Sequence, residues 1–478
     1  MLFNSMEFAV FLPVVLTLYW IIPNRHVKIQ NALLILASYT FYGWWDWRFL
    51  SLIVISSAVD YLVGLGLSKQ DNPRKRRLLL LTSIFVNIGF LGFFKYFSFF
   101  VDSFVDAFLL CGTKLNPTSL NIILPVGISF YTFQTLSYTI DVYRKKVAPT
   151  YDVLAFFAFV SFFPQLVAGP IERATNLLPQ FYKTRKFEYE GAVDGLRQIL
   201  WGLFKKIVVA DNCAEYADTI FANYTDYSGS LLLLGALYFA FQIYCDFSGY
   251  SDIAIGTARL FGFSLMRNFA FPYFSRDVAE FWRRWHISLS TWFRDYVYIP
   301  LGGSRGGTWT KIRNTFAIFL VSGFWHGANW TFVIWGFVNA CYFLPLLLLN
   351  RNRTHLNTVA QGALFPSISE FCQITTTFLL TLIAWVFFRA QSLDHAFGYI
   401  SKIFQASLFS VPSFHREHLP WIAFLLIAEW FQRDKPHVLH FQNTNLPRIV
   451  RWAFYSFLIF LIGMYMQTEQ TPFIYFQF

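Results

Sequence analysis

The stretch NTFAIFLVSGFWHGANWTFVIWGFVNACYFLPLLLLN runs from Asn314 to Asn350 and decides the fold class. It contains no Asp, Glu, Lys or Arg, and its only histidine is His326. A helix needs about 20 mostly apolar residues to cross a bilayer. The stretch therefore predicts membrane helices, and its length suits two short or broken ones. An ionisable side chain at that depth is costly, so His326 is the first candidate for chemistry.

The composition indicates the same class for the whole chain. Of 478 residues, 56% are hydrophobic, 21% are aromatic and only 14% are charged. A soluble protein carries about a quarter charged residues. The apolar runs are long and continuous, whereas a transmembrane β-barrel shows alternating segments of about ten residues. We therefore expect an all-α polytopic membrane protein. The N-terminal run lacks a basic start and a cleavage site, so we interpret it as a retained membrane segment.

We expect about ten to twelve membrane segments in a single domain, residues 1–478. Its core motifs occupy about 120–345, and C-terminal membrane helices about 370–478. No internal repeat is visible, which argues weakly against a duplicated transporter. The candidate segments are residues 6–22, 31–45, 49–68, 78–100, 120–140, 151–169, 231–248, 314–349, 371–388, 419–432 and 450–466.

Basic loops orient the chain, because cytoplasmic loops carry an excess of Lys and Arg. The basic runs at 74–77 and 144–146 predict cytoplasmic loops, and 101–119 is expected outside. The segment SFFPQLVAGP (161–170) is followed by another basic stretch, which breaks the alternation. A re-entrant segment resolves the conflict, and such backbone is tolerated only inside protein or beside a water-filled cavity. We therefore expect a cavity open towards the cytoplasm.

The stretch FWRRWHISLSTWFRDYVYIPLGGSR (281–305) carries the densest chemistry. Its aromatic residues recur at spacings of three and four, which predicts one amphipathic helix lying at the interface. Pro300 would end that helix, and the following Gly-rich loop with Arg305 could approach phosphates. The loop lacks a P-loop pattern, so a plain cytoplasmic connection stays the favoured alternative. His286 lies within the predicted helix and could line one pocket with His326.

Helical spacing places Ser322, Asn329 and Trp330 on the same face as His326. Ser322 and Asn329 could hydrogen-bond the imidazole and fix its tautomer. Gly323-x-x-x-Gly327 would let another helix approach closely. A purely structural histidine, hydrogen-bonded between helices, remains an open alternative.

The acids within the apolar segments are interpreted mainly as scaffold. Asp246 and Asp252 end one apolar segment, and Asp141 ends another that contains Gln134. Buried acids need partners, and the arginines of 283–294 are the candidates. The segment 194–210 carries two lysines (205 and 206) among apolar residues, which predicts an interfacial helix with snorkelling lysines. A basic ligand surface there is the alternative.

No metal site is expected. The five cysteines are scattered without zinc spacing and are interpreted as packed free thiols. His415 and His418, like His437 and His440, are three residues apart but have no companion ligands in the sequence. The net charge of +11 is explained first by membrane topology rather than nucleic acid. A basic face would also attract anionic headgroups or a phosphate-rich cosubstrate.

Taken in order, the motifs resemble the membrane-bound O-acyltransferase family, in particular its bacterial alginate O-acetyltransferase branch. The resemblance covers most of the chain, from the first apolar segment to the terminal FIYFQF. It rests on GISFYTFQTLSYTIDVYR (127–144), SFFPQLVAGPI (161–171), YCDFSGYSDIAIG (244–256), FWRRWHISLSTWFRDYVYIPLGG (281–303) and LVSGFWHGANWTFVIWG (320–336).

This resemblance implies a many-helix membrane fold around a tunnel. It implies that His326 is the essential histidine and that His286 is the second characteristic position. It also implies a cytoplasmic acyl donor, an extracytoplasmic glycan acceptor and an extracytoplasmic acetyltransferase partner. The relatives that the resemblance brings in acetylate exopolysaccharide or peptidoglycan, or pass D-alanine to teichoic acids.

We therefore expect transfer of an acetyl group from acetyl-CoA, with no bound cofactor, no metal and no nucleic acid, in a bacterial inner membrane. His326 acts as base or briefly as acyl carrier, and His286 assists. D-alanyl transfer, a transporter without acyl chemistry and a scaffold for other enzymes remain alternatives. Candidate substrate-binding residues are Ser322, Trp325, Asn329, Arg294, Asp295 and Arg305, and candidate donor-binding residues are Arg305, Lys311 and Arg313.

Overall fold

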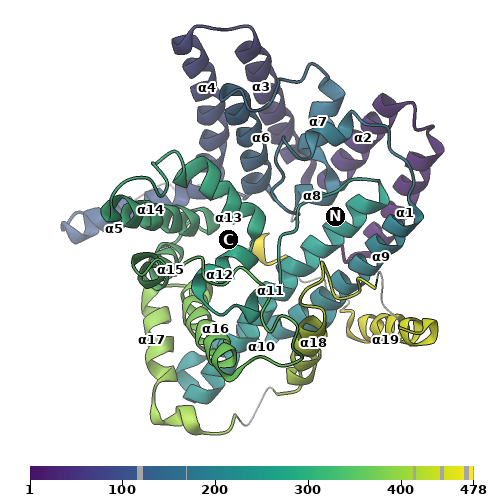
Figure 1. Ribbon diagram of the computed structural model, residues 1–478. Coiled ribbons are helices and arrows are strands. Elements are labelled where there is room, and N and C mark those ends of the chain that lie inside the picture. Colours follow the sequence, from purple (N-terminus) through teal and green to yellow (C-terminus); the bar gives the residue numbers. More distant parts are fainter. Residues whose placement is uncertain (116–121, 168, 413–415, 442–445, 468–472, 477–478) are drawn as a thin grey trace. The chain divides into compact units, whose positions relative to one another are not determined.

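The computed structural model describes residues 1–115, 122–167, 169–412, 416–441, 446–467 and 473–476. These residues form helices and connecting loops with no β-strand among them, which confirms the all-α prediction (Figure 1). The chain divides into two compact units. Unit 1 comprises Met1–Ala192 and Thr257–Leu265, and unit 2 comprises Val193–Gly256 and Met266–Phe478. His415 lies outside the described residues.

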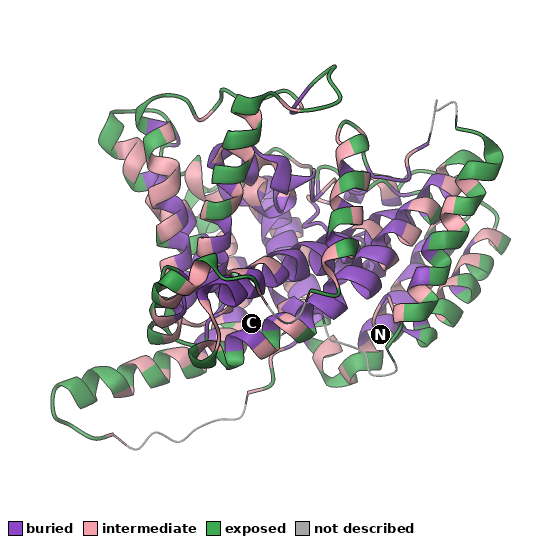
Figure 2. Cartoon of the chain, turned by 90° about the horizontal axis from the view of Figure 1, so that it is seen from below, coloured by how far each residue is buried: buried purple, intermediate pink, exposed green. Residues whose placement is uncertain are grey.

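Six helical segments of the described chain are long and apolar enough to cross a membrane. They are Val27–Ser68, Pro73–Leu110, Gly229–Leu260, Trp330–Leu348, Ile368–Arg389 and Arg448–Tyr465. Many of their large apolar side chains are exposed, which lipid contact explains and water contact would not. Figure 2 shows the contrast between chain segments that are buried throughout and helices exposed over most of their surface. The predicted count of ten to twelve segments stays a prediction.

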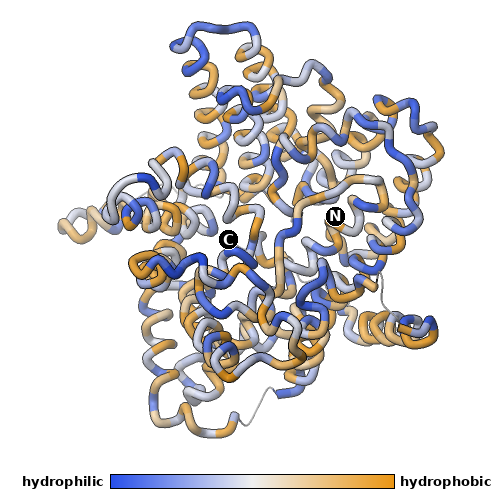
Figure 3. Tube along the Cα trace, in the orientation of Figure 1, coloured by the Kyte–Doolittle hydropathy of each residue, from blue (hydrophilic) through white to orange (hydrophobic). Residues whose placement is uncertain are grey.

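Unit 1 is built from the N-terminal helices. They are α1 (Met6–Ile21), α2 (Val27–Asp46), α3 (Leu50–Ser68), α4 (Pro73–Leu91), α5 (Phe97–Leu110), α6 (Ile128–Tyr143), α7 (Val153–Ser161) and α8 (Phe163–Leu166). The basic loop between α3 and α4 is the hydrophilic tip at the top of Figure 3, beyond two apolar helices. Asp60 is buried between α3, α4 and α6 and accepts hydrogen bonds from Ser83, Asn87 and Thr139. Neutral donors thus satisfy this intramembrane carboxylate.

The predicted re-entrant segment lies in unit 1 and does not form a spanning helix. α7 ends at Ser161, and α8 covers only four residues, Phe163–Leu166. At about 1.5 Å per residue, α7 is about 14 Å long, half of a bilayer's hydrocarbon core. Phe162 and Phe163 are fully buried, so protein surrounds the break in the helix. Re-entry from the cytoplasmic side stays a prediction.

Unit 2 is organised on one long helix, α11 (Gly229–Leu260), whose most apolar window is 89% buried. Helix α9 (Tyr189–Leu203) packs against α11 at glycines. A Cβ on Gly202 would lie 2.6 Å from the carbonyl oxygen of Gly249. A Cβ on Gly256 would lie 2.4 Å from the carbonyl oxygen of Gly195. Only glycine permits this backbone contact. The other helices are α10 (Asp211–Ala222), α12 (Val278–Arg284), α13 (Ile287–Phe293), α14 (Thr308–His326), α15 (Trp330–Leu348), α16 (Ile368–Arg389), α17 (Leu393–Ile403), α18 (Leu419–Phe431) and α19 (Arg448–Tyr465).

Candidate active site

His326 is the last residue of α14, where the chain turns sharply into α15. The two helices lie side by side (Figure 1), and glycines set their distance. A Cβ on Gly323 would lie 2.2 Å from the Phe332 carbonyl oxygen, and one on Gly336 would lie 2.4 Å from that of Phe319. The stretch thus forms two short helices, as predicted, and the predicted close approach of another helix at Gly323 is confirmed.

The helix ends at His326, so the prediction that Asn329 and Trp330 share its helical face is wrong. Gly327 has extended backbone, and Asn329 caps the next helix by accepting a hydrogen bond from Thr331 N at 3.0 Å. Asn329 also donates to the Gln391 carbonyl at 3.2 Å, and Trp330 is 54% exposed. The spacing rule failed because it assumed a continuous helix through Gly327.

His286 lies at a second helix break. The single helix predicted over the 281–305 stretch is instead α12, a break at Trp285 and His286, α13, and a π-helical turn from Arg294 to Tyr298. His286 has φ 42° and ψ 54°, a left-handed conformation that is uncommon for a residue with a Cβ. Trp285 is 1% exposed and packs against Phe269 and Trp385, so it lies in the protein interior rather than at headgroup depth.

Asn268 holds His286 in place, and no motif in the sequence pointed to this residue. Its Oδ1 lies 3.0 Å from His286 Nδ1 and accepts from Ser288 Oγ at 2.9 Å, while its Nδ2 donates to Ser251 Oγ at 3.0 Å. Because Oδ1 is the acceptor here, the proton belongs on Nδ1 and the lone pair on Nε2. Burial lowers the pKa of His286 to about 3, so the ring is neutral at physiological pH.

The two histidines share aromatic neighbours. The Trp325 ring centroid lies 4.9 Å from that of His326 and 6.2 Å from that of His286. The Tyr475 ring lies 5.6 Å from His326 and 6.5 Å from His286. In Figure 1 this C-terminal segment is the short yellow piece beside α12 and α13. Tyr475 is not among the site candidates predicted from the sequence, since it lies some 150 residues beyond His326 along the chain.

Both histidines line one cavity of about 220 Å³. Ser322 lines it too, one helical turn before His326 on α14. The remaining walls are mostly apolar, which suits a site that excludes water from a reactive acyl group. The full lining is Trp282, His286, Leu289, Ser290, Phe293, Arg294, Tyr298, Ser304, Thr315, Ile318, Phe319, Ser322, His326, Phe343, Leu347, Asn352 and Arg353.

All of these lining residues belong to unit 2. The cavity that we expect at the re-entrant segment, open towards the cytoplasm, stays a prediction.

The predicted basic residues divide into two groups. Arg294 lines the cavity and pairs with Asp295 at 2.8 Å, whereas Asp295 is not part of the lining. Arg305, Lys311 and Arg313 lie outside it. Arg313 instead donates to the Leu301 carbonyl and to Asn314 Oδ1. The second cation at the cavity is Arg353, an exposed residue after α15 that sequence spacing did not select.

Asp246 and Asp252 pair with lysines rather than with the arginines of 283–294 that we expected. Lys206 Nζ lies 2.7 Å from Asp246 Oδ1 and 2.7 Å from Asp211 Oδ1. Lys205 Nζ lies 2.6 Å from Asp252 Oδ2. Both lysines are buried, so the prediction that they snorkel at an interface is wrong. They follow α9 in a π-helical turn, Phe204–Ala210.

The arginines of α12 have other partners. Arg284 and Arg276 both pair with Glu280, at 2.7 and 3.0 Å. Arg283 donates to the carbonyl oxygens of Asn352 and His355. The last contact ties the loop that carries Arg353 to α12, close to His286. These cations therefore stabilise the cavity wall.

The lysine–aspartate triad of Lys206, Asp211 and Asp246 also supports the C-terminal segment. Asp246 Oδ2 accepts a hydrogen bond from Ile474 N at 2.7 Å. Ile474 directly precedes Tyr475, whose ring contacts both histidines. A buried charge network that includes Asp246 of α11 thus holds the backbone beside the ring that packs against both histidines.

Known proteins resemble this chain along most of its length. The family model described as MBOAT, membrane-bound O-acyltransferase family, matches residues 49–384. A probable alginate O-acetylase AlgI from Pseudomonas aeruginosa is 40% identical over 88% of this chain and 78% of its own length. A peptidoglycan O-acetyltransferase from Helicobacter pylori is 36% identical over 83% and 78%. A teichoic acid D-alanyltransferase from Streptococcus thermophilus is 31% identical over 50% and 61%.

Proposed function

This chain belongs to the membrane-bound O-acyltransferase family, and from that premise we propose that it moves an acetyl group from a cytoplasmic thioester to an extracytoplasmic glycan. The protein is an O-acyltransferase whose relatives are named for work on extracytoplasmic polymers. The proposal of acetyl transfer rests on one observation: His286, Ser322 and His326 line the same mostly apolar cavity. Acetyl-CoA is the donor that best fits this proposal.

His326 is the proposed general base. Its ring is 3% exposed and is packed between Trp325, Trp335 and Phe388, so the reacting atoms meet little water. A ring nitrogen takes the proton of the acceptor hydroxyl as the hydroxyl oxygen attacks the thioester carbonyl carbon. The carbon–sulfur bond breaks, and the thiolate leaves with that proton. A variant route, in which the acyl group first forms a bond to the imidazole, uses the same residue.

His286 is the proposed partner that holds the acceptor or the thioester. Its left-handed backbone and its bond to Asn268 fix the ring, and its pKa of about 3 keeps it neutral. A neutral ring with its proton on Nδ1 presents Nε2 as a hydrogen-bond acceptor. It can therefore orient a substrate hydroxyl without competing for the proton that His326 takes.

Arg294 and Arg353 are the proposed contacts for the donor's phosphates. Both line the cavity, and both are exposed, so they mark its open end. Guanidinium groups bind phosphate oxygens in bidentate fashion. This revises the expectation for Arg305, Lys311 and Arg313, which lie outside the lining. The acetyl end would then point inward, towards His326.

An acetyl group is favoured over D-alanine by the pattern of similarity. The two O-acetyl relatives cover more than four fifths of this chain at higher identity than the D-alanyl relative, which covers half. Acceptor glycans of the alginate or peptidoglycan type, an extracytoplasmic acetyltransferase partner and an inner-membrane location are parts of the same proposal. The apolar helices support a membrane location in general.

The test is acetyl transfer by the purified chain in liposomes supplied with labelled acetyl-CoA. Wild type should release free CoA and pass label to a soluble hexose-polymer acceptor or to an added partner protein. His326→Gln should lose transfer, while His418→Gln, a histidine outside the cavity, should keep it. Full activity of His326→Gln at wild-type protein levels would end the catalytic assignment.

The same liposomes separate the rival classes. A transporter would accumulate an unmodified solute and release no CoA. A scaffold that recruits other enzymes would tolerate loss of both His286 and His326. Labelled D-alanyl donor in place of acetyl-CoA distinguishes the two acyl groups.

A further inference from the structure

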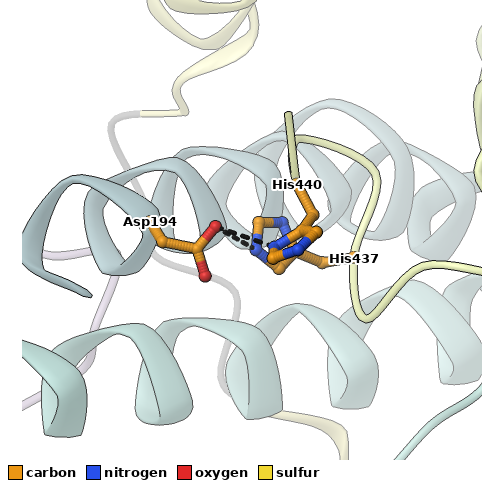
Figure 4. Close-up of side chains that lie close together, drawn as sticks. All are labelled: Asp194, His437 and His440. Carbon is orange, nitrogen blue, oxygen red and sulfur yellow. Dashed lines mark hydrogen bonds and ion pairs between the residues drawn. The ribbon is translucent and has the colours of Figure 1, made fainter. Parts of the chain in front are cut away.

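A cluster of three metal-ligating side chains lies in unit 2, outside the cavity just described. Asp194 comes from α9, and His437 and His440 come from the loop after α18 (Figure 4). Their ligand atoms all lie within 4.8 Å of one another. The aspartate and the histidines are 243 and 246 residues apart, so the fold alone brings them together. The expectation of no metal at His437 and His440 rested on the lack of such a companion.

We propose that Asp194, His437 and His440 bind a divalent first-row transition-metal ion. Two imidazole nitrogens and one carboxylate oxygen form a donor set that suits Zn²⁺ and its neighbours in that row. Three protein ligands leave further coordination positions for water or another group.

The distances fit a shared ion. Asp194 Oδ1 lies 3.1 Å from His437 Nε2 and 3.0 Å from His440 Nδ1. Two ligands each about 2.1 Å from one ion lie about 3.0 Å apart at an octahedral angle and about 3.4 Å apart at a tetrahedral one. Figure 4 shows both rings directed at the same carboxylate oxygen. An ion can therefore enter between the three ligand atoms, which already lie within 4.8 Å of one another, when the side chains rotate towards it.

The loop geometry is already set for two ligands. His440 N donates to the His437 carbonyl at 3.2 Å, which closes a turn. That turn holds the two rings with centroids 5.4 Å apart and an angle of 81° between their planes. Preformed ligands lose little conformational entropy when an ion binds.

The surroundings favour an ion that neutralises the carboxylate. Asp194 is 5% exposed and His437 is 2% exposed, and Val438 and Leu439 of the same loop are buried beside them. His440 is partly exposed, with 19% of its side chain accessible, which leaves an entry path. A carboxylate buried to this degree needs a compensating positive charge, and a divalent cation supplies it.

The site gives the ion a structural task. It links α9 to the loop between α18 and α19. One helical turn after Asp194, Gln198 donates to Asp252 Oδ1 at 2.7 Å, and α9 then leads into the buried lysines. An ion at Asp194 would therefore hold the helix that positions the charge network beneath Tyr475. This role does not depend on the proposed acyl transfer.

The test uses the full chain in nanodiscs, purified with a tag that contains no histidine. After growth with added zinc, elemental analysis should find about one Zn²⁺ per chain in wild type. Replacing a residue that only hydrogen-bonds a metal ligand lowers the metal affinity about 10- to 100-fold. Replacing a direct ligand should therefore cause the chain to lose its Zn²⁺ during purification. Asp194→Asn and His440→Gln are the test variants, and Asp434→Asn and His418→Gln are matched controls from exposed or separate positions.

Cobalt gives an independent readout. Adding CoCl₂ to chelator-treated wild type should produce visible d–d absorption bands, which His440→Gln should lack. Chelation should also lower the thermal midpoint of wild type and leave that of His440→Gln unchanged. Zinc content equal in wild type and both test variants, with no cobalt bands, would overturn the proposal and leave a hydrogen-bonded His–Asp–His cluster.

Discussion

Replacing Lys206 by methionine should destabilise unit 2 more than any surface charge change of the same kind. Its ammonium nitrogen lies 2.7 Å from one oxygen each of Asp211 and Asp246. The three side chains are 1%, 8% and 4% exposed. Methionine fills a similar volume, so the variant leaves the packing nearly intact and removes the charge that both carboxylates share.

The magnitude follows from that burial. Removing one partner of a buried ion pair costs about 3–5 kcal/mol, because the remaining charge has no compensation. Burial disfavours the Lys206 ammonium, but Asp246 and Asp211 outweigh it and raise the pKa of Lys206. Burial raises the pKa of Asp211 to about 7 against the opposing effect of Lys206. Without the lysine, the pKa of Asp211 should rise further still.

The stability loss caused by Lys206→Met should depend on pH. A carboxyl whose folded pKa is raised destabilises the fold as the pH rises above its unfolded value, about 4. The penalty of Lys206→Met should therefore grow between about pH 5 and pH 8 and shrink on acidification. The measurement is the thermal midpoint in nanodiscs at a fixed scan rate, since such unfolding is governed by rate.

Two further variants make the reasoning refutable. The triple change Lys206→Met, Asp211→Asn and Asp246→Asn should recover most of the loss, because no buried charge remains unpaired. Arg48→Met should cause no measurable change, although Arg48 pairs with Asp46 at 2.6 Å, because that guanidinium is 61% exposed. An unchanged midpoint for Lys206→Met, or a triple variant as unstable as the single one, would refute the argument.

Three further predictions concern the cavity. Asn268→Asp puts a carboxylate 3.0 Å from Nδ1 of His286, which favours the imidazolium, so the pKa of His286 should rise from about 3. Activity should then fall as the pH drops through the raised pKa. A pH–rate profile of this variant, compared with that of Asn268→Gln, checks this. Tyr475→Ala should reduce kcat about tenfold or more, because both imidazoles lose a packed ring; unchanged kcat at normal protein levels would exclude that role. Arg353→Gln should raise KM for acetyl-CoA severalfold while Arg305→Gln should not, and equal effects of the two would contradict the placement of the donor.

The fold class, and the expectation that His286 and His326 line one pocket, could be predicted from the sequence for different reasons. Long uncharged runs predict membrane helices from local composition alone. His326 was recognisable because a histidine is rare in such a run, and Gly323 because small residues permit close helix packing. The length of the 314–349 stretch indicated that it forms two helices. It did not indicate that the first helix ends at His326, because glycine at position 327 permits either a continuing helix or a turn.

Local periodicity failed where a distant partner decides the structure. The regular aromatic spacing around His286 predicts one helix, yet the contact with Asn268, 18 residues upstream, coincides with a break there. Lys206 has the same local pattern whether lipid or protein covers it, and its partner Asp246 lies 40 residues away along the chain. The Asp194–His437 contact spans 243 residues and has no local signature at all.

The two cavity histidines sit at opposite ends of helices, and that difference divides their work. His326 is the last residue of α14, a helix of 19 residues, and its ring lines the cavity. His286 precedes α13 and is buried, and that burial lowers its pKa to about 3, so its ring is neutral. We therefore propose that proton uptake during acyl transfer belongs to His326, and hydrogen bonding without proton uptake to His286. On this reasoning, loss of His326 should abolish the chemical step, whereas loss of His286 should mainly misalign the substrate.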